Sequence, residues 1–395
     1  VDSINVLVIQ AFSALAAGGA ILCSQYIGQK NHEMANKSAR QVLFIITAIS
    51  VAVTALCLLF RVPLLKLIFG KVEADVMTAS QVYFFYTALS FPFIALYDAG
   101  ASIFRSQGNT RGPMTVSVIS NVINIGGNAA LIWGFNMGVA GAAWATVLSQ
   151  LISGILCFLY MRKQYDILKF EKDEIKFEGR QAIILCNMGI PMGLQYSITA
   201  IGSVILQTAV NSLGSQAVAA VTAAGRISGF SCCPFDALGS TMATYAGQNV
   251  GAGKLDRVGK GLKSASFIGG IYAIIAFFVL SLFGRQIALL FVSADEIAIL
   301  DHVKQFLFFN TAFYIPLCLV NTVRFCIQGM GYSRLAILAG VCEMVGRIIA
   351  SLVLVPIFGF VGICLASPIA WIMADLFLVP AYCHTINRMK KILAS

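Results

Sequence analysis

Eleven long apolar stretches account for most of this 395-residue chain, and they constrain its fold more than any other feature. A helix needs about 20 mostly apolar residues to cross the hydrocarbon core of a bilayer. The stretches are too long and too evenly apolar for the strands of a membrane barrel, which alternate over about ten residues. We therefore predict an all-α polytopic membrane protein. The expected spans are 5–27, 41–62, 79–104, 113–135, 138–161, 182–210, 216–247, 265–291, 303–329, 335–357 and 360–383.

The composition excludes disordered and soluble globular proteins. Hydrophobic residues make up 58% of the chain and charged residues 11%, with a mean hydropathy of +0.85. Disordered chains combine low hydrophobicity with high charge, and soluble domains carry about 25% charged residues. The chain opens at Val1 on an apolar stretch with no basic region and no small-residue cleavage site. This start is not typical of a signal peptide.

Basic residues gather in alternate loops between the apolar stretches. Nineteen Lys and Arg fall on one side of the predicted topology, five fall on the other, and three lie inside spans. Cytoplasmic loops carry the excess of basic residues. We therefore expect a protein of the cell membrane whose C-terminus is cytoplasmic. The formal net charge of +10 then reflects membrane orientation, and we expect no nucleic-acid partner.

Cysteine and histidine give no sign of a metal or cofactor site. Most of the eleven cysteines lie within apolar stretches, no C-x-x-C spacing occurs, and the three histidines are scattered along the chain. Buried cysteine behaves as a small hydrophobic residue. We therefore predict free, buried thiols, and neither a bound metal nor a cofactor.

Four blocks of the first half recur in the second half, and the offset in residue number stays between 221 and 224. In the last block, “FNMGVAGAAWAT” resembles “IFGFVGICLAS”, with Gly138 over Gly359 and Gly141 over Gly362. A constant offset over four separated blocks indicates an internal repeat. The paired blocks are 24–41 with 247–264, 87–92 with 311–316, 106–111 with 327–334, and 135–146 with 357–367.

The repeat predicts two bundles of six helices. The first span of the second copy, 182–210, has no partner in the first copy, so we expect about forty residues, one span, before Val1. Eleven of twelve helices would then be present in this chain. Paired blocks lie on the same side of the membrane, which is typical of parallel repeats in transporters with a site between the halves. The expected parts are an N-terminal bundle at 1–162, a cytoplasmic linker at 163–181, and a C-terminal bundle at 182–395.

Acidic residues are rare inside the predicted spans: Asp98, Asp236, Glu343 and Asp375. An ionised group in hydrocarbon is costly unless it is paired or hydrated. Two interpretations of Asp98 and Asp236 stay open. Either they handle protons or cations, or each is a carboxylic acid that is paired with a neighbouring helix or kept neutral. Pro234, two residues before Asp236, is expected to interrupt its helix and leave carbonyl groups free.

Other polar residues in the spans also have two interpretations. Glu343 and Arg347 lie one helical turn apart, as a structural ion pair or as part of a transport path. Arg226 and Arg324 are expected to snorkel or to pair, with Asp375 as a candidate partner. Four neutral residues either join helices by hydrogen bonds or line a path for a cationic substrate or its coupling ion. These are Asn124, Asn128, Gln195 and Gln207.

The repeated blocks also resemble those of a known family. “SQYIGQKNHEMA”, “IFRSQGNTRGPM”, “NMGVAGAAWATVLSQ” and “GQNVGAGKLDRVGKG”, in this order, resemble the multidrug and toxic compound extrusion (MATE) transporters over the whole chain. The resemblance implies two six-helix bundles around a central cleft. It also implies export by alternating access, driven by a proton or sodium gradient. We expect a monomer that acts on small-molecule substrates within the lipid bilayer.

The family's coupling residues transfer only in part. One branch carries an N-x-x-x-D pair on its fifth helix, and here the matching residues are Asn124 and Asn128. That branch also has an Asp on its first helix, for which this chain has no match. The other branch has a Glu eight residues after the proline of its seventh helix, where this chain has Thr199 after Pro191. The resemblance therefore leaves proton and sodium coupling both open.

The leading prediction is a secondary active antiporter that exports small cationic or amphipathic organic compounds. No P-loop of the form G-x-x-x-x-G-K-[ST] occurs, so the energy is expected to come from an ion gradient or a partner. The alternative is a flippase of related fold for a lipid-linked precursor, which requires a strongly basic cleft. An enzyme is not expected, because the chain shows no cluster of catalytic side chains.

Overall fold

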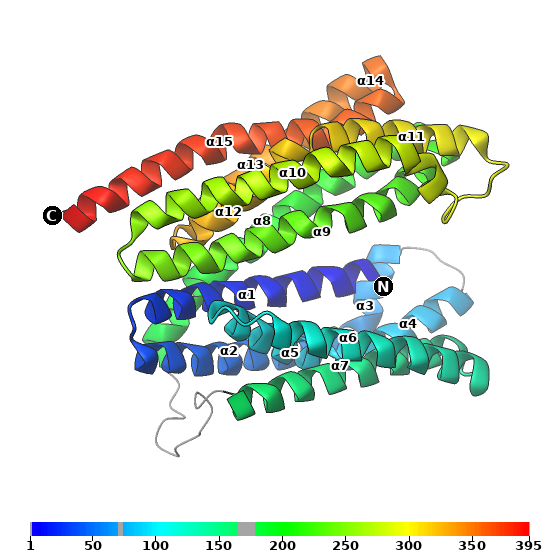
Figure 1. Ribbon diagram of the computed structural model, residues 1–395. Helices are drawn as coiled ribbons and strands as arrows, with labels where there is room; N and C mark the ends of the chain where they lie inside the picture. The colour runs from blue at the N-terminus through cyan, green and yellow to red at the C-terminus, as the bar shows by residue number, and fades with distance from the viewer. Residues whose placement is uncertain (1, 70–73, 165–177, 395) are drawn as a thin grey trace. The chain divides into compact units, whose positions relative to one another are not determined.

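The regular structure of this chain is helical throughout the ranges that the structure describes (Figure 1). The computed structural model describes residues 2–69, 74–164 and 178–394, and no β-strand occurs within them. The predicted all-α class is confirmed. Residues 165–177, most of the predicted linker 163–181, lie outside the described residues.

The chain divides into two compact units, which we call unit 1 (1–193) and unit 2 (194–395). The helices before the linker are α1 (Asp2–Gly28), α2 (His32–Leu59), α3 (Arg61–Phe69), α4 (Ala74–Leu89), α5 (Phe91–Ser106), α6 (Arg111–Asn128), the π-helical segment η1 (Ala129–Gly134) and α7 (Gly138–Gln164). Those after it are α8 (Gly179–Ser212), α9 (Ser215–Gly251), α10 (Leu255–Ala288), α11 (Ile297–Ala312), α12 (Tyr314–Gly329), α13 (Ser333–Ile349), the π-helical segment η4 (Ala350–Leu354), α14 (Val355–Phe358) and α15 (Phe360–Ala394).

The division between the units falls inside α8. The first half of α8 packs on α1 through two glycines, since a Cβ on Gly18 would lie 2.6 Å from the backbone nitrogen of Gly189. Small residues permit such a close approach of helices in a membrane. Unit 2 begins at Leu194, whereas the second copy of the sequence repeat is predicted to begin at residue 182. The predicted boundaries therefore stay predictions.

All eleven predicted spans coincide with helices, but two of them are bent. Eight helices of the described residues are long and apolar enough to cross a membrane, and up to ten spans result if each bent pair counts as one. The pair α4 and α5 bends by 41°, and the pair α11 and α12 by 51°. The predicted continuous spans 79–104 and 303–329 are wrong in this respect. The span predicted at 216–247 forms α9, which is not among the sufficiently apolar helices.

The sequence repeat is also a repeat of backbone conformation. Gly138 and Gly359 stand at the start of equivalent helices with φ of 54° and 57°. Lys30 and Gly253, which the repeat places over each other, follow equivalent helices with φ of 59° and 69°. The two bent pairs and the two π-helical segments also occupy matching places. The two copies therefore share their irregular features as well as their helices.

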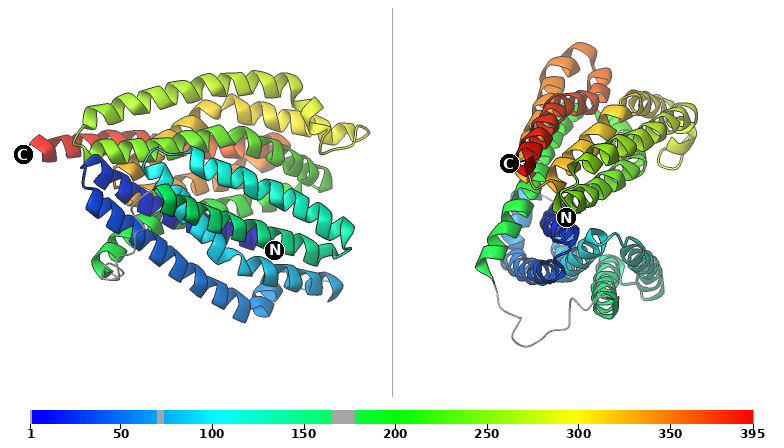
Figure 2. Two further views of the ribbon diagram at one scale, coloured as in Figure 1. Left: turned by 60° about the horizontal axis from the view of Figure 1, so that its bottom comes forward. Right: turned by 60° about the vertical axis from the view of Figure 1, so that its left-hand side comes forward.

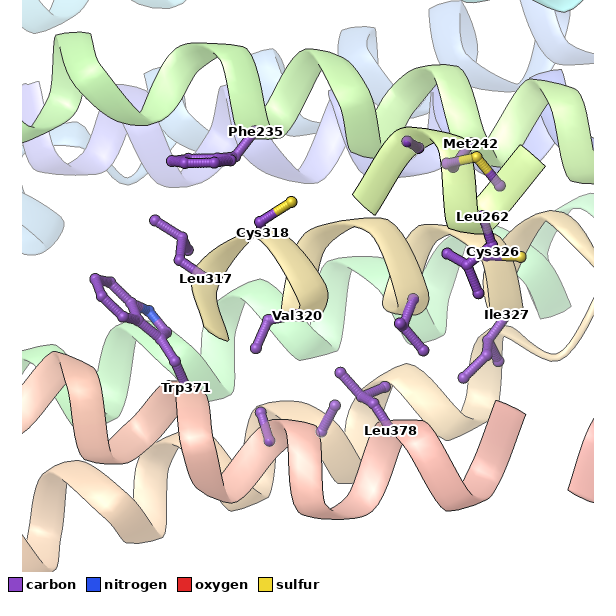
Figure 3. Close-up of a cluster of buried hydrophobic side chains, with 14 of the residues drawn as sticks. Phe235, Met242, Leu262, Leu317, Cys318, Val320, Cys326, Ile327, Trp371 and Leu378 are labelled. Atoms are coloured by element: carbon purple, nitrogen blue, oxygen red, sulfur yellow. The ribbon is translucent and has the colours of Figure 1, made fainter. Parts of the chain in front are cut away.

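Each unit has its own helix contacts. In unit 2, α12 packs against α9, α10, α13 and α15, and Figure 2 shows these long helices running side by side. Figure 3 shows Phe235 of α9, Leu317 and Cys318 of α12, and Trp371 of α15 in the buried cluster that they share. In unit 1, α5 packs against α1, α2 and α7. The second helix of each bent pair, α5 in unit 1 and α12 in unit 2, thus packs against several helices of its unit.

Candidate ion and substrate sites

Asp98 contacts a neighbouring helix of unit 1. It lies on α5, which packs against α1. The hydroxyl of Ser13 on α1 donates a hydrogen bond to Asp98 Oδ2 at 2.7 Å. One residue before Ser13, the ring of Phe12 meets the ring of Phe91 edge-on, with centroids 6.3 Å apart. Asp98 is half-buried, so it keeps some exposed surface. The hydroxyl of Ser13 holds its carboxyl group by the hydrogen bond described above.

The same helix contact recurs in unit 2, and it fixes the register of the repeat. Phe235 on α9 meets Tyr314 on α12 edge-on, with ring centroids 5.4 Å apart. Both residues lie 223 positions after Phe12 and Phe91. Helices α5 and α12 also have the same length, and their first residues show the same offset. An offset of 223 therefore relates the two units in this region.

With this register, the pair Ser13 and Asp98 corresponds to the pair Asp236 and Asn321. Asp236 is exposed on α9, and Asn321 is buried on α12 with 7% of its surface exposed. Unit 1 carries its carboxylate on α5, and unit 2 carries its carboxylate on α9, the equivalent of α1. Each unit therefore has one carboxylate at these two positions. In unit 1 it lies on the second helix of the contact, α5, and in unit 2 on the first, α9.

Helix α9 is continuous through Pro234, so the predicted interruption is wrong. Side chains from other helices anchor this part of α9 instead. The hydroxyl groups of Ser231 and Tyr314 share a hydrogen bond of 2.5 Å. The hydroxyl of Tyr272 on α10 donates to the carbonyl oxygen of Ser231 at 2.8 Å. Asp236 thus follows a segment that is fixed to both α10 and α12.

Glu343 lies between two arginines in the interior of unit 2. Arg324 Nη2 of α12 pairs with Glu343 Oε1 of α13. Arg347 Nη2, one turn along α13, lies 3.6 Å from Glu343 Oε2. The exposed fractions are 7% for Arg324, 4% for Glu343 and 8% for Arg347. Arg347 Nη1 also lies 3.5 Å from the carbonyl oxygen of Thr199 on α8. The predicted pair is therefore part of a trio.

Two polar groups around this trio lack partners. Arg324 Nε and Asp375 Oδ1 are buried and have no hydrogen-bond partner within the described part of the chain. Asp375, on α15, is half-buried. Further along α12, Gln328 Nε2 donates to Gln195 Oε1 of α8 at 3.0 Å. Polar side chains from α8, α12, α13 and α15 therefore lie in the interior of unit 2.

The two predicted asparagines of unit 1 lie at a helix interface. Asn124 Nδ2 of α6 donates to Ser149 Oγ of α7 at 3.3 Å. Asn128 Nδ2 donates to Asn124 Oδ1 at 3.1 Å. Asn128 Oδ1 is buried and has no partner among the residues described. The two asparagines thus connect α6 to α7. Asn128 Oδ1 is the acceptor of this group that has no hydrogen-bond donor within the described residues.

Other predicted residues lie apart from these groups. Gln207 Nε2 donates to Asn211 Oδ1 on its own helix at 3.0 Å, and Arg226 is exposed on α9. All eleven cysteines are free thiols, and six of them are buried, but Cys233 and Cys383 are exposed, so the prediction of buried thiols is wrong for these two. No group of three or more His, Cys, Asp or Glu able to hold a metal ion occurs within the described ranges.

Sequence reasoning missed two residues that the repeat could have identified. The offset of 223 leads from Asp98 to Asn321 and from Asp236 back to Ser13. Ser13 was passed over because a serine in an apolar helix usually bonds its own backbone.

Comparisons with known proteins agree on one family. The sequence model of the MatE family matches residues 1–130 and 191–353. The chain is 25% identical over 303 residues to the probable multidrug resistance protein YoeA of Bacillus subtilis (strain 168). The matched region covers 75% of this chain and 65% of YoeA. The match therefore spans slightly less than two thirds of YoeA. The chain is also 23% identical over 386 residues to the FAD transporter of Shewanella oneidensis. This match covers 94% of this chain and 83% of that protein.

A solved structure shares the fold. The crystal structure of MATE in complex with MaL6 matches with a TM-score of 0.92 and 19% identity, over 98% of this chain and 87% of that one. The predicted architecture is therefore confirmed at the level of the fold. The Shewanella relative is named a transporter and the Bacillus relative a probable multidrug resistance protein.

Proposed function

Because the chain belongs to the MatE family, we propose that it is a secondary active antiporter that exports small cationic or amphipathic organic compounds. The relative YoeA is named a probable multidrug resistance protein, which supports this class of substrate. The observation that carries the proposal is the pair of carboxylates at Asp98 and Asp236, placed once in each copy of the same helix contact. Ionisable residues within membrane spans mark ion and substrate pathways.

Competition for one carboxylate, combined with alternating access, can couple two ligands in antiport. A carboxylate binds a proton, a sodium ion or the ammonium group of an organic substrate, and each of these ligands reduces the affinity for the others. Binding of the ion on one side then favours release of the substrate there, because the two ligands exclude each other. Asp98 and Asp236 supply the charge for this exchange, and Ser13 orients Asp98 through its hydrogen bond.

The proposal is tested by transport into everted membrane vesicles with ethidium as the probe. Asp98→Asn and Asp236→Asn are each assayed under a proton gradient and then under a sodium gradient. We expect each substitution to reduce export by at least about tenfold under the coupling ion, which is about 1.4 kcal/mol. The matched control is Asp256→Asn, because Asp256 is exposed and pairs at 2.7 Å with Lys390 on the surface. Unchanged export in both test variants would remove these residues from the coupling step.

An organic anion is the second candidate substrate. The FAD transporter relative supports it, as do the two buried guanidinium groups of Arg324 and Arg347. Both guanidinium groups already engage Glu343, which reduces their attraction for an anion. Uptake of FAD into the same everted vesicles, with no uptake of ethidium, would favour this candidate.

The flippase alternative needs a strongly basic cleft for a lipid-linked precursor. Of the three arginines inside spans, Arg324 and Arg347 are buried and paired with Glu343, and only Arg226 is exposed. The structure therefore favours the flippase less than it favours an exporter of organic cations or organic anions. The protein is a multi-pass membrane protein, and we propose from its loop charges that its C-terminus is cytoplasmic.

A further inference from the structure

The end of unit 2 at which α10 begins and α15 ends carries an excess of exposed basic residues (Figure 1). Residues 254–263 include four basic residues and one acid, and residues 382–394 include three basic residues and no acid. Lys254, Arg257, Lys260 and Lys263 are all exposed, and none of the four forms an ion pair among the residues that the structure describes. Loop charge bias alone explains such an excess, but it does not explain its placement on one helix face.

Helix α10 places its basic residues in line with an exposed apolar stripe. Residues three, four or seven positions apart lie on the same face of a helix. Lys260 and Lys263 precede Phe267 by seven and four positions, and the face that they share continues in apolar side chains. This apolar stripe consists of Phe267, Ile271, Ile274, Phe278 and Leu282, whose exposed fractions run from 46% to 70%. The outer face of α10 is therefore basic in its first turns and apolar beyond them.

Helix α15 adds a further cation to the same face. Lys390 Nζ donates to Asp256 Oδ1 of α10 at 2.7 Å, and both side chains are exposed. Asp256 lies one turn before Lys260, so the ion pair holds Lys390 beside the basic turns of α10. The helices also approach each other at Gly259, where a Cβ would lie 3.6 Å from the hydroxyl of Tyr382 on α15. We call the resulting group the basic patch: Lys254, Arg257, Lys260, Lys263 and Lys390.

We propose that the basic patch binds the headgroup of an anionic phospholipid, and that the apolar stripe of α10 contacts one of its acyl chains. Clusters of four or more basic residues next to a membrane-spanning helix attract anionic lipids. The apolar stripe favours a lipid over a nucleic acid or an acidic protein, because only the lipid brings a hydrocarbon chain to it. The headgroup contacts α10 and Lys390 together, so the lipid joins α10 to α15. The site does not depend on which compound is exported, nor on Asp98 or Asp236.

The equivalent end of unit 1 has fewer free charges. The repeat offset of 223 leads from Lys260 and Lys263 back to Lys37 and Arg40 of α2, but from the two earlier basic residues of α10 to uncharged residues. Lys37 pairs with Glu178. Lys37 and Arg40 are half-buried, whereas Lys260 and Lys263 are exposed. Unit 1 therefore offers a matched control within the same chain.

The test measures the unfolding temperature of the purified full chain in a neutral detergent as phosphatidylglycerol is added. A ligand that binds the folded state raises this temperature as its concentration rises, which gives an apparent dissociation constant. Phosphatidylcholine with the same acyl chains has no net charge and serves as the comparison. We expect phosphatidylglycerol to raise the unfolding temperature of the wild type at concentrations at which phosphatidylcholine has no effect.

Two double variants locate the site. We expect Lys260→Gln/Lys263→Gln to raise the apparent dissociation constant for phosphatidylglycerol at least about tenfold, which is about 1.4 kcal/mol. The control Lys37→Gln/Arg40→Gln removes the same charge from the equivalent positions of unit 1, and we expect it to leave this constant unchanged. Each variant is compared by its dissociation constant, so a change in its unfolding temperature without lipid does not affect the comparison.

Three further probes distinguish a lipid from other anions. Glycerophosphoglycerol is the headgroup without its acyl chains, and polyglutamate and a single-stranded RNA represent an acidic protein and a nucleic acid. We expect all three to bind more weakly than phosphatidylglycerol, because none of them can use the apolar stripe.

Any of four results overturns the proposal. These are an equal response of the wild type to phosphatidylcholine, an unchanged dissociation constant in Lys260→Gln/Lys263→Gln, an equal loss of affinity in Lys37→Gln/Arg40→Gln, or binding of one of the three chain-free anions as tight as that of the lipid. None of these results bears on the transport proposal, because export and lipid binding are read by different measurements.

Discussion

Single residues show that the two units use one helix contact with the charge transposed. Unit 1 has Asp98 on α5 and Ser13 on α1, joined by a hydrogen bond. At the equivalent positions unit 2 has Asn321 on α12 and Asp236 on α9. Like charges at one site oppose each other's ionisation. A pair that contains a single acid avoids that repulsion, whichever of its two helices carries the acid. The acid can therefore lie on α5 in unit 1 and on α9 in unit 2 while the same helices remain in contact.

The transposition predicts that the unit 1 arrangement can be moved into unit 2. Asn321→Asp alone places a second acid in the pair, and we expect ethidium export to fall about tenfold, or about 1.4 kcal/mol. Asp236→Ser alone removes the acid and is expected to lower export similarly. The double variant Asp236→Ser/Asn321→Asp recreates the pair of unit 1 and should recover most of the export rate. A double variant no better than the weaker single variant would contradict the equivalence of the two pairs.

Helical elements show which features a sequence can predict. The apolar stretches predicted the eight helices and two bent pairs that are long and apolar enough to cross a membrane, because burial in lipid sets both the length and the composition of a helix. The bends before α5 and α12 were missed, although Pro92 and Pro316 lie in the first turn after each break, where proline is favoured. The π-helical segments η1 and η4 gave no signal, since an extra residue in a turn depends on packing. The side-chain partners of Asp98 and Glu343 depend on packing in the same way.

The glycines paired by the repeat explain how each π-helical segment is packed. Gly141 follows η1 and Gly362 follows η4. A Cβ on Gly362 would lie 2.6 Å from the carbonyl oxygen of Leu354, and a Cβ on Gly141 would lie 3.1 Å from that of Leu131. Both obstacles are backbone atoms, which move only with their helix. The sequence identified this pair of glycines, and the structure supplies the reason for it.

These distances predict a graded effect of alanine on stability. We expect Gly362→Ala to lower the free energy of unfolding by about 1–3 kcal/mol, as overpacking does, and Gly141→Ala to lower it less. Gly270→Ala is the control, because nothing lies within 4 Å of its added Cβ. Alanine favours helix over glycine by about 1 kcal/mol, so the control should be neutral or stabilising. Thermal unfolding of the purified variants measures the order, and a reversed order would contradict the packing described.

At the scale of the whole molecule, the bent pairs determine the topology. A bent pair either crosses the membrane as one broken span or turns back as a re-entrant loop. From the segment 289–296 to the C-terminus, the chain passes through the pair α11 and α12, then α13 with η4 and α14, and then α15. If the pair is one broken span, the chain crosses three times and the two points lie on opposite sides. If the pair is re-entrant, the chain crosses twice and they lie on the same side.

Loop charge favours the broken span, because the predicted cytoplasmic side then holds the basic residues at both 254–263 and 388–391. We therefore expect a fluorescent protein fused after Ser395 to be fluorescent in the cytoplasm. Alkaline phosphatase inserted after Ala294, which is active only outside the cytoplasm, should be active. The same phosphatase inserted after Gly253 is the matched control and should be inactive. An inactive insertion after Ala294, together with a fluorescent C-terminal fusion, would show that α11 and α12 form a re-entrant loop.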